Sequence, residues 1–155
     1  IRFRKWNYAL GATIALLHDV LFVLGIFSLT WKFMPFSMEI DQAFIAAILT
    51  IVGYSINDTV VVYDRLREYL NLHHGGDNEQ VINSAVNSTF SRTIITAVTT
   101  ILVVFVLFLF GGEVIKGFTF ALLLGMFVGT YSSIFIGSAV VLDTAKFVEK
   151  KKLKK

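Results

Sequence analysis

Hydrophobic residues gather into four long stretches that are separated by shorter polar segments. Each stretch has roughly the ~20 residues that an α-helix needs to cross the hydrocarbon core of a bilayer. Backbone groups inside a bilayer have no water to bind, so such stretches form helices. The pattern therefore predicts an all-α polytopic membrane protein with four transmembrane helices, at about residues 8–31, 43–62, 93–110 and 118–142.

The segments between these spans differ in length and character. Residues 32–42 form a short loop around a proline, and residues 111–117 form a turn flanked by glycines. The polar segment 63–92 first continues the second span as a helix and breaks at His-His-Gly-Gly, residues 73–76. It then resumes as an amphipathic helix at the membrane surface that leads into the third span. The apolar face of that helix consists of Val81, Ile82, Ala85, Val86 and Phe90.

Composition agrees with a membrane protein. The 155 residues are 55% hydrophobic and 16% charged, with a mean hydropathy of +0.72. Soluble domains are about 25% charged, so a soluble enzyme is excluded. The absence of cysteine excludes disulfides and thiolate metal sites. Because the chain begins at Ile1 and shows no cleavable signal peptide, we expect it to be part of a longer chain.

Basic residues are unevenly distributed between the two sides of the predicted bundle. Of the 14 Lys and Arg residues, two, Lys32 and Lys116, fall on one side. The rest share the side of the N-terminus, segment 63–92 and the C-terminus, which predicts that this side is cytoplasmic in a bacterial inner membrane. The excess is concentrated in the tail 143–155, so we expect no nucleic-acid partner. Two interpretations of the tail stay open, namely attraction to lipid headgroups and simple solvation.

Ionisable residues inside a span are candidates for function, because burying a charge in a bilayer costs about 2.5–3.5 kcal/mol or more. Asp58 lies near the end of the second span and Arg92 opens the third, so we expect them at similar depth on neighbouring helices. Burial favours a protonated carboxyl group, whereas a nearby arginine favours the ionised form. Movement of Arg92 relative to Asp58 would therefore support a proton relay. The alternative is a static ion pair that fixes two helices.

Further polar residues accompany this pair. His18 and Asp19 lie near the middle of the first span, and Asn57 precedes Asp58. We interpret His18 and Asp19 as a secondary polar site, either a hydrogen bond between helices or a part of the relay. Residues 73–74 are both histidine, but two imidazoles do not supply a metal site, so we expect neither metal nor cofactor. An intramembrane aspartyl protease is disfavoured because Asp19 and Asp58 are predicted at different depths.

Small residues recur at every fourth position of the fourth span, which predicts close approach to another helix. This small-residue ridge consists of Gly117, Ala121, Gly125, Gly129, Ser133 and Gly137.

Three long motifs make the chain recognisable: ALLHDVLFVLGIFSL (15–29), GYSINDTVVVYDR (53–65) and FGGEVIKGF…GTYSSIF (110–135). Over residues 10–142 the sequence closely resembles the SecF branch of the SecD/SecF family, within the resistance–nodulation–division superfamily. The resemblance implies a six-helix bundle of which this chain holds the last four helices. It also implies that two helices and a large periplasmic domain precede Ile1 in the longer chain.

The resemblance also implies a function and a set of roles. Asp58 matches the aspartate of the family's GYSxND motif, Arg92 matches the arginine of its SRT motif, and His18–Asp19 matches its HD pair. The family members work with SecD, separate or fused, beside the SecYEG translocon and with YajC. They use the proton motive force to promote export of preproteins, and are not enzymes. Whether the coupling ion is H⁺ or Na⁺ stays open.

Two other functions stay open beside this one. A related superfamily transporter would export lipid or drug. A purely structural module would dock SecD through the small-residue ridge and would hold Asp58 and Arg92 as a static pair.

Overall fold

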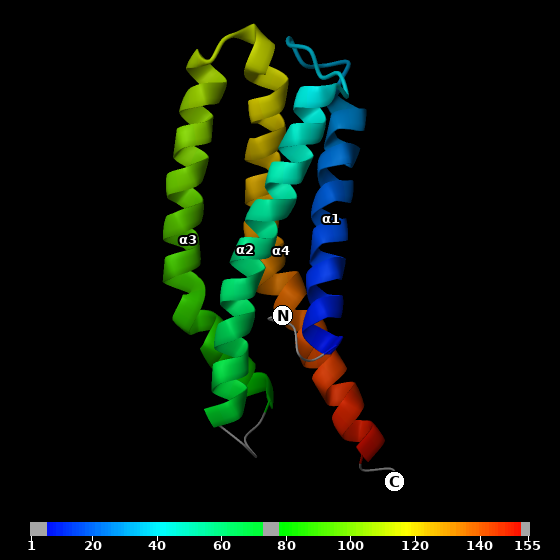
Figure 1. The fold of residues 1–155 in the computed structure, drawn as a ribbon, viewed down its shortest axis with the longest axis vertical. Helices are drawn as coiled ribbons and strands as arrows, with labels where there is room; N and C mark the ends of the chain where they lie inside the picture. The colour runs from blue at the N-terminus through cyan, green and yellow to red at the C-terminus, as the bar shows by residue number, and fades with distance from the viewer. Residues whose placement is uncertain (1–5, 73–77, 153–155) are drawn as a thin grey trace.

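The structure is a computed structural model that describes residues 6–72 and 78–152. Four helices make up its secondary structure within these ranges: α1 (Trp6–Thr30), α2 (Gln42–Leu72), α3 (Asn78–Phe110) and α4 (Glu113–Lys152) (Figure 1). Each is long and apolar enough to cross a membrane. The prediction of an all-α protein with four transmembrane helices is therefore confirmed.

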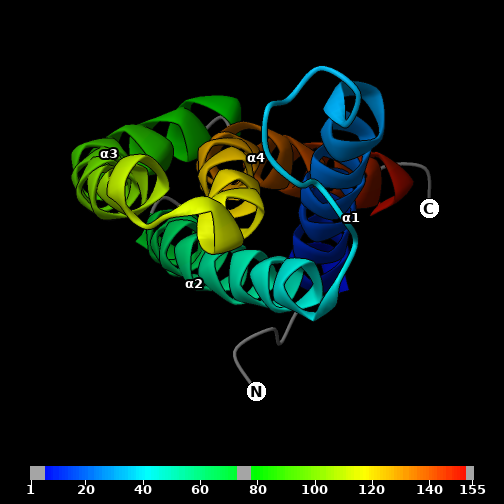
Figure 2. The same ribbon diagram turned by 90° about the horizontal axis from the view of Figure 1, so that it is seen from above.

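The helices alternate in direction along the chain (Figure 1). The start of α1, the end of α2, the start of α3 and the end of α4 lie at one end of the bundle, which we call the tail end. The connections 31–41 and 111–112 lie at the opposite end, which we call the loop end. Figure 2 shows α4 surrounded by the other three helices, all of which it contacts. Within the described ranges, α1 and α3 do not touch each other.

The loop between α1 and α2 ends in a helix cap. Asp41 Oδ1 accepts a hydrogen bond from the backbone N–H of Phe44 at 2.8 Å, as an N-cap side chain does. The carbonyl of Asp41 accepts another from Ile45 at 3.1 Å. The predicted loop 32–42 is thus confirmed to within a residue, because α2 begins at Gln42.

The turn between α3 and α4 is tighter than predicted. Gly112 has a φ of 81°, a left-handed conformation that glycine adopts readily at the end of a helix. Helix α4 then begins at once, at Glu113, whose side chain pairs with Lys116 one turn later. The predicted turn over 111–117 is therefore wrong after residue 112, because an ion pair between positions i and i+3 supports helix there.

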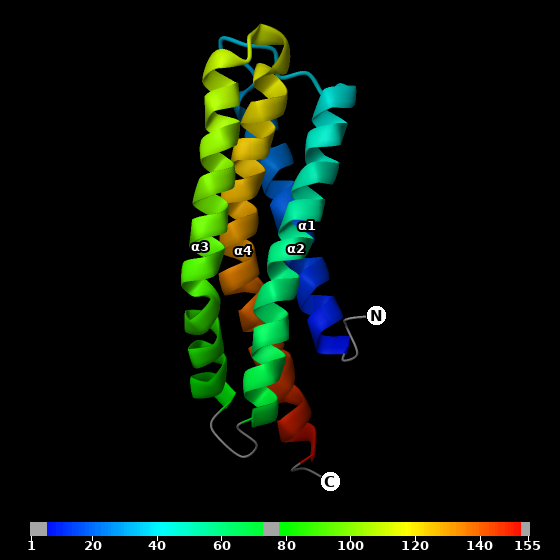
Figure 3. The same ribbon diagram turned by 60° about the vertical axis from the view of Figure 1, so that its left-hand side comes forward.

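The expected surface helix in segment 63–92 is not a separate element. Helix α2 runs on to Leu72, and the amphipathic residues form the first turns of α3, which continues without a break alongside α4 (Figure 3). Ile82 and Ala85 are buried in a cluster with Leu66 of α2, so the apolar face packs on protein. Phe90, expected on this face, is exposed.

Helix α3 bends near its start (Figure 1). Near this point three hydroxyl groups donate hydrogen bonds to backbone carbonyls of their own helix, those of Ser84, Ser88 and Thr89. Such bonds often bend a helix. The bend brings the polar first turns of α3 back toward α2 and α4.

The core has two apolar parts with a polar layer between them. Toward the loop end, one cluster contains Val23, Phe27, Phe44, Ala47, Ile51, Val104, Ala121, Leu122, Leu123 and Met126. Toward the tail end, a second contains Tyr8, Ala12, Val62, Tyr63, Leu66, Ile82, Ala85 and Val141. Between the two clusters along their helices lie buried polar residues, among them Asp19, Ser55, Asp58, Thr59, Thr93, Thr130, Ser132 and Ser133. The candidate site lies in this polar layer.

Some predictions fall on residues that the structure does not describe. The histidines at 73–74 lie in one such stretch, and the side chains of the tail from residue 145 onward are likewise not described. What was expected of these residues stays a prediction.

Candidate functional site

The small-residue ridge of α4 packs against a matching row on α2. Four positions of α2, also spaced by four, face four positions of the ridge, in the order Ile51–Gly125, Ser55–Gly129, Thr59–Ser133 and Tyr63–Gly137. Because both rows have the same spacing, the two parallel helices stay in register over three helical turns. We call this contact the α2–α4 seam.

The contacts of the seam are close and partly polar. A methyl group added at Gly129 would lie 3.3 Å from Ser55 Cβ, and one added at Gly125 would overlap the Ile51 side chain. The hydroxyls of Thr59 and Ser133 lie 2.8 Å apart, and the Tyr63 hydroxyl donates to the Gly137 carbonyl at 3.0 Å. Small residues thus let two backbones approach and form hydrogen bonds, as in other membrane helix pairs.

The seam corrects one hypothesis. The structural-module hypothesis placed the ridge on a surface that docks SecD, but the ridge faces the chain's own helices. Ala121 and Ser133 have no exposed surface, and a methyl group added at Gly117 would lie 2.6 Å from the backbone oxygen of Ser37 in the loop. The sequence showed a surface for close packing, but periodicity alone does not identify the helix that packs on it.

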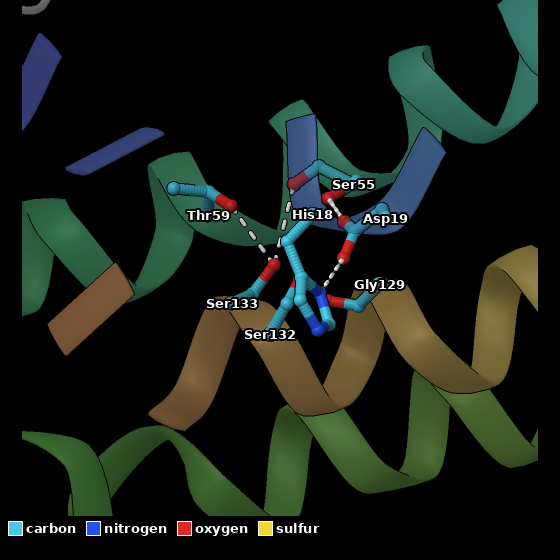
Figure 4. A network of polar contacts seen from close by, with 7 residues as sticks. All are labelled: His18, Asp19, Ser55, Thr59, Gly129, Ser132 and Ser133. Carbon is cyan, nitrogen blue, oxygen red and sulfur yellow. Dashed lines mark hydrogen bonds and ion pairs between the residues drawn. The ribbon is translucent and has the colours of Figure 1, made fainter. Parts of the chain in front are cut away.

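Asp19 lies at the centre of a buried network that joins three helices (Figure 4). Ser55 of α2 donates a hydrogen bond to Asp19 Oδ2 at 2.7 Å. His18 Nδ1 lies 3.2 Å from Asp19 Oδ1, and a methyl group added at Gly129 of α4 would lie 3.6 Å from Asp19 Oδ2. Ser133 adds a longer bond of 3.4 Å to the Ser55 carbonyl. Both oxygens of this fully buried carboxyl group therefore have partners, and the hydrogen bond between helices, one of the two interpretations of this pair, is present.

The network shows that Asp19 and Asp58 lie at more similar depths than predicted. Ser55, which binds it, precedes Asp58 by three residues, so the two carboxyl groups lie about one turn, or ~4.5 Å, apart along α2. The predicted separation between mid-span and span end is therefore too large. Asp58 lies near the middle of α2 because this helix continues to Leu72. Among the described contacts no hydrogen bond joins the two carboxyl groups, so they share no proton as a protease pair would.

Asp58 is buried but incompletely bonded. Its side chain is 7% exposed, and its Oδ2 atom is buried without a hydrogen-bonding partner on the protein. Arg92 is the basic residue that acts on it electrostatically, from α3. The two residues form no ion pair within 4.0 Å, and Arg92 is exposed. The expectation of similar depth is met, whereas the static ion pair is not formed.

A polar cleft between α2 and α3 leads toward this carboxyl group. The cleft has a volume of about 560 Å³ and is lined by Asn57, Val61, Asp64, Arg65, Glu68, Ser88, Thr89 and Arg92. Arg65 Nε donates to Ser88 Oγ at 3.1 Å across it, and Arg65 also pairs with Glu68 at 2.7 Å. Because its lining extends from Glu68 to Asn57, the cleft runs from the tail end into the polar layer.

Comparison with known proteins agrees with this geometry. A family model described as protein export membrane protein SecD/SecF, C-terminal, matches residues 1–147. The chain belongs to the SecD/SecF family. The resemblance expected from the motifs of α1, α2 and α4 is confirmed.

Relatives within the SecD/SecF family share much of this sequence. The protein translocase subunit SecF of Rhodothermus marinus is 60% identical over 143 residues, which is 92% of this chain and 46% of that protein. The SecF subunit of Thermodesulfovibrio yellowstonii is 50% identical over 148 residues, which is 94% of this chain and 47% of that protein. The chain therefore spans a little under half the length of these relatives.

Solved SecDF structures share the fold. A crystal structure of SecDF in a super-membrane-facing form matches with a TM-score of 0.89 and 39% identity, over 97% of this chain and 20% of that one. A SecDF from Thermus, described as a translocon-associated membrane protein, matches with a TM-score of 0.81 and 42% identity, over 92% of this chain and 19% of that one.

Two residues of the site were not singled out from the sequence. Tyr63 completes the α2 row of the seam, and the only signal for it was its spacing of four from Thr59. Thr93 is a buried threonine of the polar layer, with 1% of its surface exposed. Its signal in the sequence was its place directly after Arg92 in the SRT motif, residues 91–93.

Proposed function

We propose that this chain is the C-terminal membrane part of a SecF-type subunit that uses the proton motive force, together with SecD, to promote preprotein translocation across the bacterial cytoplasmic membrane. Family membership supports this, as do the relatives named protein translocase subunit SecF. The match to SecDF structures supports SecD, separate or fused, as the partner. The SecYEG translocon, YajC and the exported preprotein are the further partners of this proposal.

One observation carries the proton-coupled part of the proposal. Asp58 is a buried carboxyl group with an unpartnered oxygen, in a polar layer that a cleft connects to one end of the bundle. A fully bonded carboxyl group such as that of Asp19 suits a structural role, because Ser55 and His18 already occupy its two oxygens. An unpartnered one can change its protonation state without breaking a bond.

The residues of the site then have distinct roles. Asp58 takes up and releases the proton. Arg92, near enough to act electrostatically but not bonded, changes the proton affinity of Asp58 when α3 moves relative to α2. The Asp19 network and the seam hold α1, α2 and α4 together, so in this proposal α3 is the helix that moves.

The structure favours this function over the alternatives. The static-pair hypothesis needs a direct Asp58–Arg92 bond, and Asp58 Oδ2 has no such partner. A lipid or drug transporter of the same superfamily is disfavoured by relatives named SecF that match over 92% and 94% of the chain.

The proposal includes an orientation, with the tail end in the cytoplasm. We expect a cysteine at Asn71, an exposed residue near the end of α2, to react with an impermeant thiol reagent only from the cytoplasmic side. The matched variant is Glu39→Cys, at an exposed position in the connection at the loop end, which we expect to react only from outside. Labelling of both positions in intact spheroplasts and in inverted vesicles checks this. Reaction of Asn71→Cys from outside would reverse the orientation.

The substitution Asp58→Asn tests proton coupling directly. Asparagine keeps the shape of the side chain but does not titrate, so we expect complete loss of the proton-dependent part of export by the full-length subunit. The measurement is secretion of a reporter preprotein by cells that carry only the variant, with and without a protonophore. Asp143→Asn, at an exposed position of α4, is the control and should export normally. Wild-type export by Asp58→Asn would leave a structural role only.

A further inference from the structure

Two buried side-chain atoms in the described part of the chain have no hydrogen-bonding partner on the protein. They are Asp58 Oδ2 and Thr93 Oγ1. Other threonines of α3 donate to carbonyls of their own helix, at 2.9 Å for Thr89, 3.0 Å for Thr96 and 2.8 Å for Thr100. Thr93 makes no such bond, although only 1% of its surface is exposed. Buried polar atoms are nearly always bonded, so two unbonded ones call for a common explanation.

The antiparallel register of α2 and α3 places these atoms at nearly the same depth. The bond between Arg65 and Ser88 aligns the two helices. Asp58 lies seven residues before Arg65 on α2, and Thr93 lies five residues after Ser88 on α3. Because the two helices run in opposite directions, both residues are displaced toward the loop end. At ~1.5 Å per residue, the two depths differ by only about 3 Å.

The polar cleft reaches the neighbours of both residues. Its lining includes Asn57 and Arg92, which immediately precede Asp58 and Thr93 in the sequence. Among the described residues, the charged or titratable groups near Asp58 include Arg92 of α3, Tyr54 of α2 and, about one turn away through Ser55, Asp19 of α1. Helix α4 has no charged residue between Lys116 and Asp143, so it presents only neutral groups here.

We propose that Asp58 and Thr93 form the two sides of a hydration site that takes water or hydronium, and that Thr93 is a positioning residue for proton exchange at Asp58. A hydroxyl group offers one donor and two acceptor positions, so it binds a water molecule in either protonation state of the carboxyl group. In the uptake step a hydronium ion transfers one proton to Asp58 Oδ2. Neutral water remains, held by Thr93 Oγ1. Buried waters of this kind bind otherwise unsatisfied polar groups.

This inference deepens the proposed function and rests on it, but its test has a separate readout. The C=O stretch of protonated Asp58 can be measured by infrared difference spectroscopy on the full-length protein and assigned with Asp58→Asn. We expect Thr93→Val to move this band to higher frequency, because the carboxyl group loses a bonded water. We expect Thr93→Ser to keep the band in place. Proton-driven export should fall by about tenfold in Thr93→Val, the scale of one lost hydrogen bond.

Thr119→Val is the matched control, since Thr119 is fully buried and its hydroxyl donates to the Ile115 carbonyl at 2.8 Å. This control should leave the C=O stretching frequency of Asp58 and the rate of proton-driven export unchanged. Valine has the shape of threonine, so Thr93→Val should fold. An unchanged band with normal export in Thr93→Val would overturn the hydration site. Normal export by Asp58→Asn would instead overturn the proposed function, regardless of the C=O frequencies measured in the Thr93 variants.

Discussion

Replacing Gly125 with leucine is expected to separate α2 from α4 and to destabilise the bundle by at least about 3 kcal/mol, the upper range for overpacking a core. Even a methyl group at this position would overlap three atoms of the Ile51 side chain. Ile51 cannot move aside freely, because it is fully buried in the apolar cluster toward the loop end. The gain in helix propensity from removing glycine, about 1 kcal/mol or less, does not offset this.

The matched control is Gly53→Leu, two residues after Ile51 on α2. Gly53 is exposed, and a methyl group added there would meet no atom within 4 Å. It should therefore be neutral or slightly stabilising. The free energy of unfolding of the full-length protein in detergent micelles distinguishes the two variants. Equal stability of Gly125→Leu and Gly53→Leu would contradict the close packing of the seam.

A second substitution makes this test sharper. If the overlap with Ile51 is the cause, then Ile51→Ala should recover part of the stability lost by Gly125→Ala, although each change alone is destabilising. Such a double-mutant cycle isolates the interaction between two residues in contact. Since the ridge packs inside the chain, loss of SecD binding in these variants would follow from loss of the fold.

The positions of the four helices could be predicted because long apolar runs have few other solutions in a membrane protein. Their ends could not. Asp64, Arg65 and Glu68 end the apolar pattern of the second span, yet α2 continues through them. Charged residues do not break a helix, and the Arg65–Glu68 pair supports it. The apolar face of residues 81–85 is then buried against α2, and the apolar pattern of the spans does not indicate this contact.

The candidate site could be predicted in part for a similar reason. Asp58 and Arg92 stand out because ionisable residues are rare inside spans. Their shared depth followed from the connection between the helices, but the absence of a direct bond depends on side-chain positions that no spacing encodes. Which partner Asp19 binds, and that Thr93 lacks one, depends on how the helices are rotated about their axes. Periodicity gives the face of a helix but not the neighbour that covers it.

Rotation of the helices also explains why one buried aspartate suits a structural role and the other a proton-carrying role. Asp19 faces α2 and α4. Ser55 of α2 bonds to one of its oxygens, and His18, next to Asp19 on α1, bonds to the other. Asp58 directly follows Asn57, which lines the polar cleft between α2 and α3. The carboxyl group of Asp19 thus has two partners on the protein, whereas Asp58 Oδ2 has none.

The single variants Asp58→Asn and Arg92→Gln are both expected to abolish proton-coupled export, and combining them is not expected to restore it. Asp58→Asn removes the group that we propose carries the proton. Arg92→Gln removes the charge on α3, so movement of the helices no longer changes how tightly Asp58 holds its proton. Because the two groups form no ion pair, we expect neither variant to lose more than about 1 kcal/mol of stability, the scale of an exposed charge interaction.

A static ion pair predicts different stabilities for the single variants and a different outcome for the double variant. Each single variant would then lose about 3–5 kcal/mol, because a buried charge would be left without its partner. The neutral double variant Asp58→Asn/Arg92→Gln would recover both stability and export. The comparison needs the free energy of unfolding and the protonophore-sensitive export rate of the same three full-length variants. Recovery of export in the double variant would exclude the relay, whereas stable but inactive single and double variants are the result that proton transfer through Asp58 requires.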